Sequence, residues 1–215
     1  MRSLTIPSVD LTTLQSVPAR IAHLIHSGAQ APIDQLNWPE TFPKTMPVKV
    51  HIAHNGDTLF LCYCVEGEPL RATHTRDFDP VWQDSCVEFF MKREQEPVYR
   101  NFEWNVLGVL LAARRESRDS FQRLTREVKK VLRHSSIQPR YDGDRQLSDW
   151  QLYLEIPKEI MGYLPGETLT GQRINANFYK CGDETEEPHY LSWNPVDLPV
   201  PDFHTPQFFG LLELE

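Results

Sequence analysis

The sequence predicts an all-β fold, an antiparallel β-sandwich of the jelly-roll or immunoglobulin-like kind, with an N-terminal helical segment and one inserted helix. Seventeen prolines against ten glycines suit many short segments joined by rigid turns. Several short apolar runs follow residue 48, and Pro- or Gly-containing breaks separate most of them. A hydrophobic content of 40% is enough for a sizeable core.

The clearest strand signal is a hairpin. Val48, Val50 and Ile52 alternate with polar residues, and the turn sequence Asn55-Gly56-Asp57 leads into a second apolar run over 59–65. Further strands are expected at 86–91, 102–111, 150–156, 174–179, 189–193 and 209–214. Short strands at this spacing are typical of a sandwich or a barrel.

The N-terminal residues have the signals of a helix. Ser16 and Pro18 are suited to its first turn, and Gly28 to its end. The apolar stripe between them is formed by Ile21, Leu24 and Ile25. We expect this helix to cover one edge of the sandwich, so the chain divides into a helical extension over 1–35 and the sandwich over 36–215.

A second helix is expected in the basic segment 114–133. The apolar residues at helical spacing are Phe121, Leu124, Val128, Val131 and Leu132, and arginines and lysines fill most positions around them. The basic face has two interpretations, a site for an acidic partner or polyanion, and the solvated surface of an otherwise acidic protein. The solvated surface is the more common of the two.

Charge and hydropathy limit the partners. A net charge of −8 repels phosphate backbones and anionic lipid surfaces, so we expect no nucleic-acid partner. No stretch reaches the roughly 20 apolar residues of a membrane helix, and residues 1–28 lack the apolar core of a signal peptide. We therefore expect no membrane partner, and the sequence as given favours the cytoplasm.

The four cysteines do not follow a disulfide or zinc pattern. Cys62 and Cys64 lie too close in sequence for a zinc knuckle, and Cys181 and His189 are eight residues apart. A domain of this size does not need disulfides to fold. We expect Cys62, Cys64, Cys86 and Cys181 to be buried thiols.

The segment 81–90 differs from an ordinary strand. Glu88 stands within the apolar run Val87-Glu88-Phe89-Phe90, directly after the polar residues 83–85. A carboxylate in such a run is costly to bury unless it is paired or hydrogen-bonded to a ligand. The sequence therefore places the centre of a candidate site here.

The chain also resembles the family 9 carbohydrate-binding modules, and more closely the family-9-like proteins of bacteria, which have a DOMON-like sandwich. The resemblance covers about residues 45–215 in the family's order. Its blocks are Trp82 with Asp84-Ser85-Cys86-Val87-Glu88-Phe89-Phe90, Asn101-Phe102-Glu103-Trp104-Asn105 with Gly108, Asn177-Phe178-Tyr179-Lys180-Cys181-Gly182-Asp183, His189-Tyr190-Leu191-Ser192-Trp193, and Pro201-Asp202-Phe203-His204 with Phe208-Phe209-Gly210.

The resemblance implies a site that holds a sugar between two aromatic rings. Trp82 matches the first ring, Phe203 takes the place of the second, which is usually tryptophan, and Glu88 matches a hydroxyl-binding acid. Asn105 matches a polar position, but Glu103 replaces the arginine found two residues before it in the better studied modules. The candidate carbohydrate-binding residues are Trp82, Glu88, Glu103, Asn105, Phe203 and His204.

The resemblance also implies structural calcium held by acidic and carbonyl oxygens. Asp57, Asp77, Asp79 and Asp183 have loop contexts suited to such ligands. None of them shows the regular spacing of a calcium loop, and solvated acids remain the more common explanation. No other cofactor is expected.

The function expected is non-catalytic binding of a mono- or oligosaccharide, alone or beside a glycoside hydrolase. An alternative is a haem-binding or protein-interaction sandwich, for which Met91, Met161, His189 and His204 are available as axial ligands. A weak glycosidase is a third hypothesis. No spacing singles out a carboxylate pair, and the Gly-x-Ser-x-Gly motif of serine hydrolases is absent.

Overall fold

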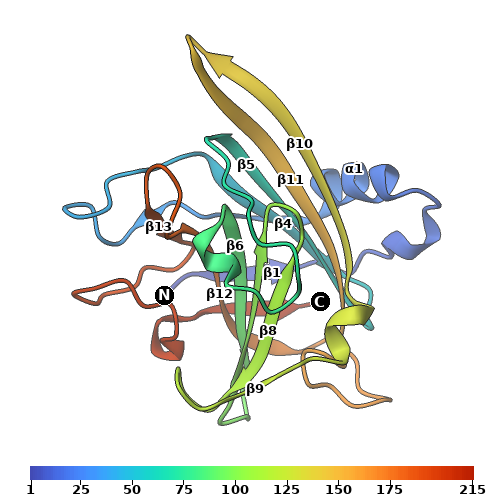
Figure 1. The fold of residues 1–215 in the computed structure, drawn as a ribbon. Coiled ribbons are helices and arrows are strands. Elements are labelled where there is room, and N and C mark those ends of the chain that lie inside the picture. Colours follow the sequence, from blue (N-terminus) through green and yellow to red (C-terminus); the bar gives the residue numbers. More distant parts are fainter.

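The computed structural model describes residues 1–215 and confirms the β-sandwich (Figure 1). A large sheet has the order β1 (Ser3–Ile6), β14 (Gly210–Leu214), β12 (Arg173–Gly182), β6 (Cys86–Arg93), β7 (Tyr99–Asn105), β8 (Leu110–Arg115) and β9 (Phe121–Arg123), with β13 (His189–Ser192) on β12 and β3 (Gln35–Leu36) on β13. A small sheet has the order β10 (Leu132–Asp142), β11 (Arg145–Pro157), β5 (Thr58–Glu68), β4 (Val48–His54) and β2 (Ala29–Pro32).

The hairpin predicted from the sequence joins β4 and β5. Gly56 takes φ +89° in its turn, and the Asn55 side-chain oxygen accepts hydrogen bonds from the backbone N–H groups of Asp57 and Thr58. Every strand pairing in the molecule is antiparallel except β1 with β14. The turn chemistry therefore sets the register of the small sheet locally.

The N-terminal helix is α1 (Val17–Ser27), and both of its ends are where the sequence predicts them. The Ser16 hydroxyl accepts a hydrogen bond from the Ala19 N–H, and the Gly28 N–H donates to the Leu24 carbonyl. The helix lies over the outer face of the small sheet, where Leu24 packs near Phe60 (Figure 1). None of the helices has both the length and the apolar run needed to span a bilayer.

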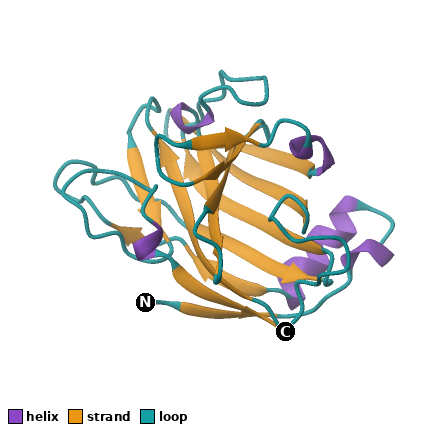
Figure 2. Cartoon of the chain, turned by 90° about the horizontal axis from the view of Figure 1, so that it is seen from below, coloured by secondary structure: helices purple, strands orange, loops and turns teal.

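Residues 1–35 are more than a helical extension. They add β1 to the edge of the large sheet and β2 to the edge of the small one. The 3₁₀ helix η1 (Leu11–Thr13) precedes α1, and both lie at the periphery, while strands fill the centre (Figure 2).

The prediction of a helix in the segment 114–133 is wrong. Residues 121–123 form β9, Glu127–Lys130 is a single 3₁₀ turn (η3), and β10 begins at Leu132. Val128 and Val131 point into the core between the sheets, whereas Phe121 is half exposed beside Arg115. Pairing with β8 and β11 overrides the apolar spacing, because ladder hydrogen bonds and long-range packing outweigh local preference.

The single strand expected over 102–111 is two strands. β7 ends at Asn105 and β8 begins at Leu110. The Asn105 side-chain oxygen accepts from the backbone N–H groups of Leu107 and Val109, and Gly108 adopts φ +80°. An asparagine followed by a glycine in the left-handed region closes the turn.

The large sheet is buried on both of its faces. Val87, Phe89 and Phe178 point inward to the core shared with the small sheet, while Phe90 and Tyr179 point outward into a second cluster. Successive side chains of a strand alternate between faces, so a strand covered on both sides is apolar at almost every position. This explains the continuous run from Val87 to Phe90. The tryptophans Trp104, Trp150 and Trp193 are buried as well.

A buried ion pair joins the two sheets. The Lys180 ammonium on β12 lies 2.7 Å from one Glu68 oxygen on β5, and the Trp150 indole donates to the other at 2.8 Å. Lys180 also donates to the His189 ring at 2.8 Å, and burial together with this ammonium lowers the pKa of His189 to about 3. All the polar atoms around Lys180 are therefore acceptors, as a buried ammonium requires.

Replacing only one member of this pair should cost far more than replacing both. We expect Lys180→Met to lower the free energy of unfolding by about 3–5 kcal/mol, because Glu68 is left buried without a counter-charge. The double variant Lys180→Met/Glu68→Gln keeps an acceptor for Trp150 and should recover part of that loss. Urea denaturation of the three proteins measures both effects, and a double variant no more stable than the single one contradicts this account.

Candidate functional site

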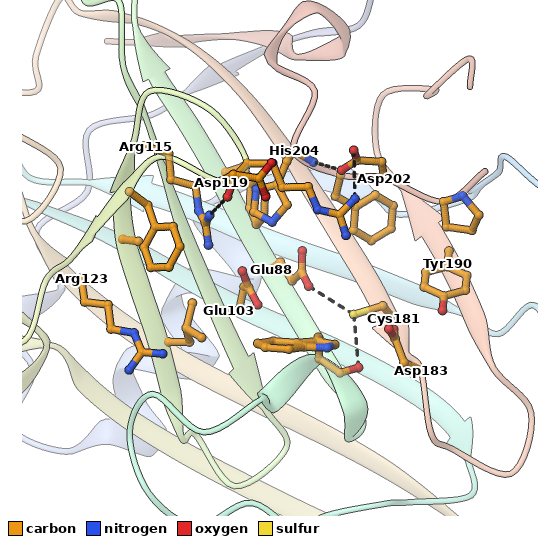
Figure 3. A pocket seen from close by; sticks show the side chains of 18 residues that line it. Glu88, Glu103, Arg115, Asp119, Arg123, Cys181, Asp183, Tyr190, Asp202 and His204 are labelled. Carbon is orange, nitrogen blue, oxygen red and sulfur yellow. Dashed lines mark hydrogen bonds and ion pairs between the residues drawn. The ribbon is translucent and has the colours of Figure 1, made fainter. Parts of the chain in front are cut away.

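A cavity of about 350 Å³ opens on the outer face of the large sheet (Figure 3). Its floor consists of side chains from the adjacent strands β12, β6, β7 and β8, which include Cys181, Glu88, Glu103 and Ala113. Its walls come from η2 (Val81–Gln83), the β8–β9 connection, the β12–β13 end and residues 201–204. A volume of this size is within the range of small-ligand sites.

Five of the six candidate carbohydrate-binding residues line this cavity. Trp82, Glu88, Glu103, Phe203 and His204 are brought together from four separate parts of the chain. Asn105, the sixth, is fully buried and does not belong to the lining.

Asn105 has a structural position behind the site. Its amide donates to the His74 carbonyl at 2.8 Å and to Asp84 at 2.9 Å, while its oxygen closes the β7–β8 turn. Burial alone would raise the pKa of Asp84, but hydrogen bonds from His74, Asn105 and Thr73 outweigh it and lower that pKa. Asn105 therefore has no free polar atom to offer a ligand.

Glu88 and Glu103 are opposite each other on neighbouring strands. The β6–β7 register pairs them directly, and both point to the outer face (Figure 3). Directly paired side chains have Cβ atoms about 4.5–5.5 Å apart, and like charges at that spacing are destabilising. The cavity floor is thus built around two carboxyl groups that repel each other when ionised.

Glu103 is held by a chain of hydrogen bonds. The Asn101 amide donates to Glu103 Oε1 at 2.7 Å, and Arg115 Nε donates to the Asn101 oxygen at 2.6 Å. Burial nevertheless raises the pKa of Glu103 to about 7, although Asn101 and Arg115 oppose the shift. This carboxyl changes its protonation near neutral pH.

Glu88 has fewer partners. The Cys181 thiol lies 3.2 Å from its Oε1, and its Oε2 is buried with no hydrogen-bond partner. Burial, followed by the neighbouring Cys181 and Glu103, raises the pKa of Glu88 well above its ordinary value. A neutral carboxyl with an unpartnered oxygen has hydrogen-bonding capacity that the protein does not use.

The two candidate aromatic platforms differ in exposure. Trp82 keeps 36% of its surface accessible at the mouth of the cavity. Phe203 keeps only 8%, since it stacks on Tyr179 with ring centroids 4.0 Å apart and an interplanar angle of 11°. Trp82 therefore offers the larger free plate.

His204 lies at the wall opposite the floor carboxyls (Figure 3). Its Nδ1 is 3.1 Å from the Tyr99 hydroxyl, and its ring packs near Phe90. Burial, with Arg115 and Arg118 nearby, lowers the pKa of His204 to about 3. The imidazole is therefore neutral over the physiological pH range.

Sequence reasoning missed a polar wall on each side of the cavity. Arg115 and Arg123 stand on one side and Asp183 and Asp202 on the other (Figure 3). The arginines belong to the segment that the helical pattern misassigned, and their side chains reach the site only because β8 and β9 pair. Asp183 was expected only as a calcium ligand, and Asp202 only as part of a block that resembles the family. Burial raises the pKa of Asp183, opposed by a hydrogen bond from Tyr190.

The four calcium candidates do not gather at one place. Asp57 pairs with Lys158, Asp77 with Arg133, and Asp79 accepts from the Arg76 N–H. Asp183 lines the cavity. These four carboxylates form no cluster of three or more ligand atoms.

The haem-ligand candidates are equally dispersed. Met91 and Met161 belong to the core between the sheets, and His189 is enclosed beside Lys180. Only His204 lines the cavity. The structure therefore assembles no axial pair from these residues.

One cluster of metal-ligand atoms does exist, and no sequence spacing indicated it. Cys86, Glu88 and Cys181 have ligand atoms that all lie within 4.8 Å of one another. All four cysteines are free and buried, as expected from the sequence.

The raised pKa of Glu103 makes a testable contribution to stability. Between pH 4.5 and about 7 the folded protein retains a proton that the unfolded chain releases, so this contribution is present at low pH and is lost as the pH rises through the window. The glutamine of Glu103→Gln does not titrate. Relative to that variant, wild type should lose on the order of 3 kcal/mol of unfolding free energy between pH 4.5 and about 7. Urea denaturation at several pH values tests this, and a pH-independent difference refutes it.

A model of carbohydrate-binding family 9 matches residues 21–214. A solved structure described as a "putative carbohydrate-binding protein", from Bacteroides uniformis, is 32% identical, with a TM-score of 0.86 over 100% of this chain and 99% of that one. None of the curated proteins is similar enough to count as a match.

Two more distant structures are of a family 9 module from Caldicellulosiruptor kristjanssonii. The complex with glucose is 9% identical (TM-score 0.56, 100% of this chain and 96% of that one), and the complex with cellotriose is 10% identical (0.59, 100% and 94%). At these identities the likeness shows the fold. The family model and the Bacteroides structure together cover almost the whole sequence, and the chain belongs to carbohydrate-binding family 9.

Proposed function

We propose that this protein binds a mono- or oligosaccharide in the cavity and does not transform it. The observation that carries this proposal is the pairing of an accessible indole, Trp82, with a floor of two buried carboxyl groups, Glu88 and Glu103. Membership of carbohydrate-binding family 9 supports it.

The indole suits the apolar face of a pyranose. Sugars present patches of C–H groups that stack on aromatic rings, and Trp82 supplies the most exposed ring among the predicted platforms. Phe203 is mostly covered by its neighbours, so it contributes an edge of the wall. The sugar is therefore held chiefly from one side.

The floor suits the hydroxyl groups of the same ligand. Glu88 Oε2 has no partner, and a sugar hydroxyl would supply the missing hydrogen bond. A neutral Glu88 carboxyl can also donate a hydrogen bond to a hydroxyl oxygen. Arg123 and Asp183, on opposite walls, offer further polar contacts to the hydroxyl groups of the ligand.

The geometry favours binding over catalysis. The two carboxyls of a glycosidase flank the scissile bond, one as the acid and the other as the base or nucleophile. Here Glu88 and Glu103 project side by side from the same floor of the cavity, because the β6–β7 register pairs them directly. The pair resembles a hydroxyl-binding floor more than an acid and a nucleophile.

Glucose and cellotriose are the first ligands to test, because the Caldicellulosiruptor kristjanssonii module was solved in complex with each of them. A glycoside hydrolase is the protein partner that we propose for such a binding domain, and its substrate would then carry the same sugar.

Removing the indole should abolish most of the affinity. We expect Trp82→Ala to weaken binding of the best sugar at least about tenfold, since one aromatic platform is worth roughly 1–3 kcal/mol. Isothermal titration calorimetry measures the change. Tyr141→Ala is the control, because Tyr141 is 71% exposed on β10 and does not line the cavity. Equal affinity in Trp82→Ala and wild type would remove Trp82 from the site.

The protein should also show no glycosidase activity. Wild type should hydrolyse aryl glycosides of the sugars that bind no faster than the Glu88→Gln/Glu103→Gln protein does. Turnover that depends on either carboxyl would overturn the binding-only proposal while leaving the location of the site intact.

A further inference from the structure

We propose that Cys86, Cys181 and Glu88 form a binding site for a thiophilic divalent cation, Zn²⁺ in the first instance, at the floor of the cavity. This site goes beyond sugar binding; it shares Glu88 with the proposed sugar floor, but its two other ligands, Cys86 and Cys181, do not depend on a sugar.

The strand register creates the site. Cys86 on β6 is paired directly with Cys181 on β12, and both side chains point to the outer face. Glu88 is two residues beyond Cys86 on the same strand and therefore on the same face. Three metal-binding side chains from two adjacent strands thus converge on one point.

The distances match those around a metal ion. With zinc–sulfur bonds near 2.3 Å and zinc–oxygen bonds near 2.1 Å, a tetrahedral site has a sulfur–oxygen separation of about 3.6 Å. The Cys181 and Cys86 sulfurs lie 3.2 and 4.0 Å from Glu88 Oε1, on either side of that value. Small side-chain rotations would bring all three atoms into the coordination sphere.

An independent observation points to a missing ligand. Glu88 is 3% exposed, and its Oε2 has no hydrogen-bond partner. Buried carboxyl oxygens are almost always paired, so an unpaired one at a cluster of thiols requires an explanation. A bound cation supplies it.

The surroundings also favour positive charge. The lining of the cavity has more acidic than basic side chains: Glu88, Glu103, Asp119, Asp183 and Asp202 against Arg115, Arg118 and Arg123. A divalent cation would reduce this excess of negative charge. Lys180, the nearest ammonium in sequence, points to the opposite face of the sheet and is engaged by Glu68.

The chemistry of the ligands selects the metal. Two thiolates favour zinc and other soft ions over calcium or magnesium, which prefer oxygen. On binding, the thiols and the carboxyl release their protons to solvent as two metal–sulfur bonds and one metal–oxygen bond form. Three protein ligands leave the fourth position open, and Cys181 and Glu88 line the cavity into which it would face.

The test is metal binding by the reduced, full-length chain. We expect one Zn²⁺ per chain in a chelator-competition titration, with release of protons to the buffer. Co²⁺ in its place should give thiolate-to-metal charge-transfer absorption. Cys86→Ala, Cys181→Ala and Glu88→Gln should each weaken Zn²⁺ binding at least about 100-fold, more than loss of an outer-shell partner. Glu88→Gln is nearly isosteric and covers the case in which a cysteine variant fails to fold.

The matched control is Cys62→Ala/Cys64→Ala, which removes the two buried thiols of β5 on the small sheet. It should bind Zn²⁺ as wild type does. Three outcomes would each overturn the three-ligand site. They are absence of Zn²⁺ binding by reduced wild type, loss of binding in this control alone, and wild-type affinity in Glu88→Gln. Because the readout is metal and not sugar, these outcomes are independent of whether a saccharide binds.

Discussion

The structure depends on one constraint, which is that the large sheet is covered on both faces. Its inner residues must fill the space against the small sheet, so period-two alternation sends every other residue of β6, β7 and β12 outward. That alternation aligns Glu88, Glu103 and Cys181 on a single surface. A slip of one residue in any of these strands would turn its part of the site into the core. The packing that stabilises the fold therefore also places the functional groups.

The site is one of the places where buried polar groups remain without a partner. Between the sheets, Lys180 and Glu68 neutralise each other and their remaining partners complete the hydrogen bonding. On the outer face, two carboxyls are paired across strands, and only Glu103 is held by an amide. Burying them without full compensation costs stability, and such costs are typical of binding sites. A ligand or a cation that supplies the missing partners would stabilise the folded state by mass action.

Local signals predicted the local elements well. The Asn-Gly turn identified the β4–β5 hairpin, Ser16 and Gly28 bounded α1, and the odd position of Glu88 marked the site. Features that depend on long-range strand pairing could not be predicted from the sequence. Cys86 and Cys181 meet only because β6 pairs with β12, and Arg115 and Arg123 reach the cavity only because β8 and β9 replace the expected helix. Nothing in the sequence alone fixes the register of strands that lie so far apart.

Glu103 illustrates how one substitution changes what such a floor can bind. Family 9 modules that carry arginine at this position present a fixed cation beside the acid, whereas this chain presents a second acid whose pKa lies near 7. The guanidinium of Arg115 contacts Asn101 and not Glu103, so it orients the amide that donates to the carboxyl. An arginine at this position could only donate hydrogen bonds, whereas a carboxyl accepts them when ionised and can also donate when neutral. Hydroxyl groups suit both acids because they donate and accept, and a metal ion held by Glu88 and the two thiols would lower the negative charge beside Glu103.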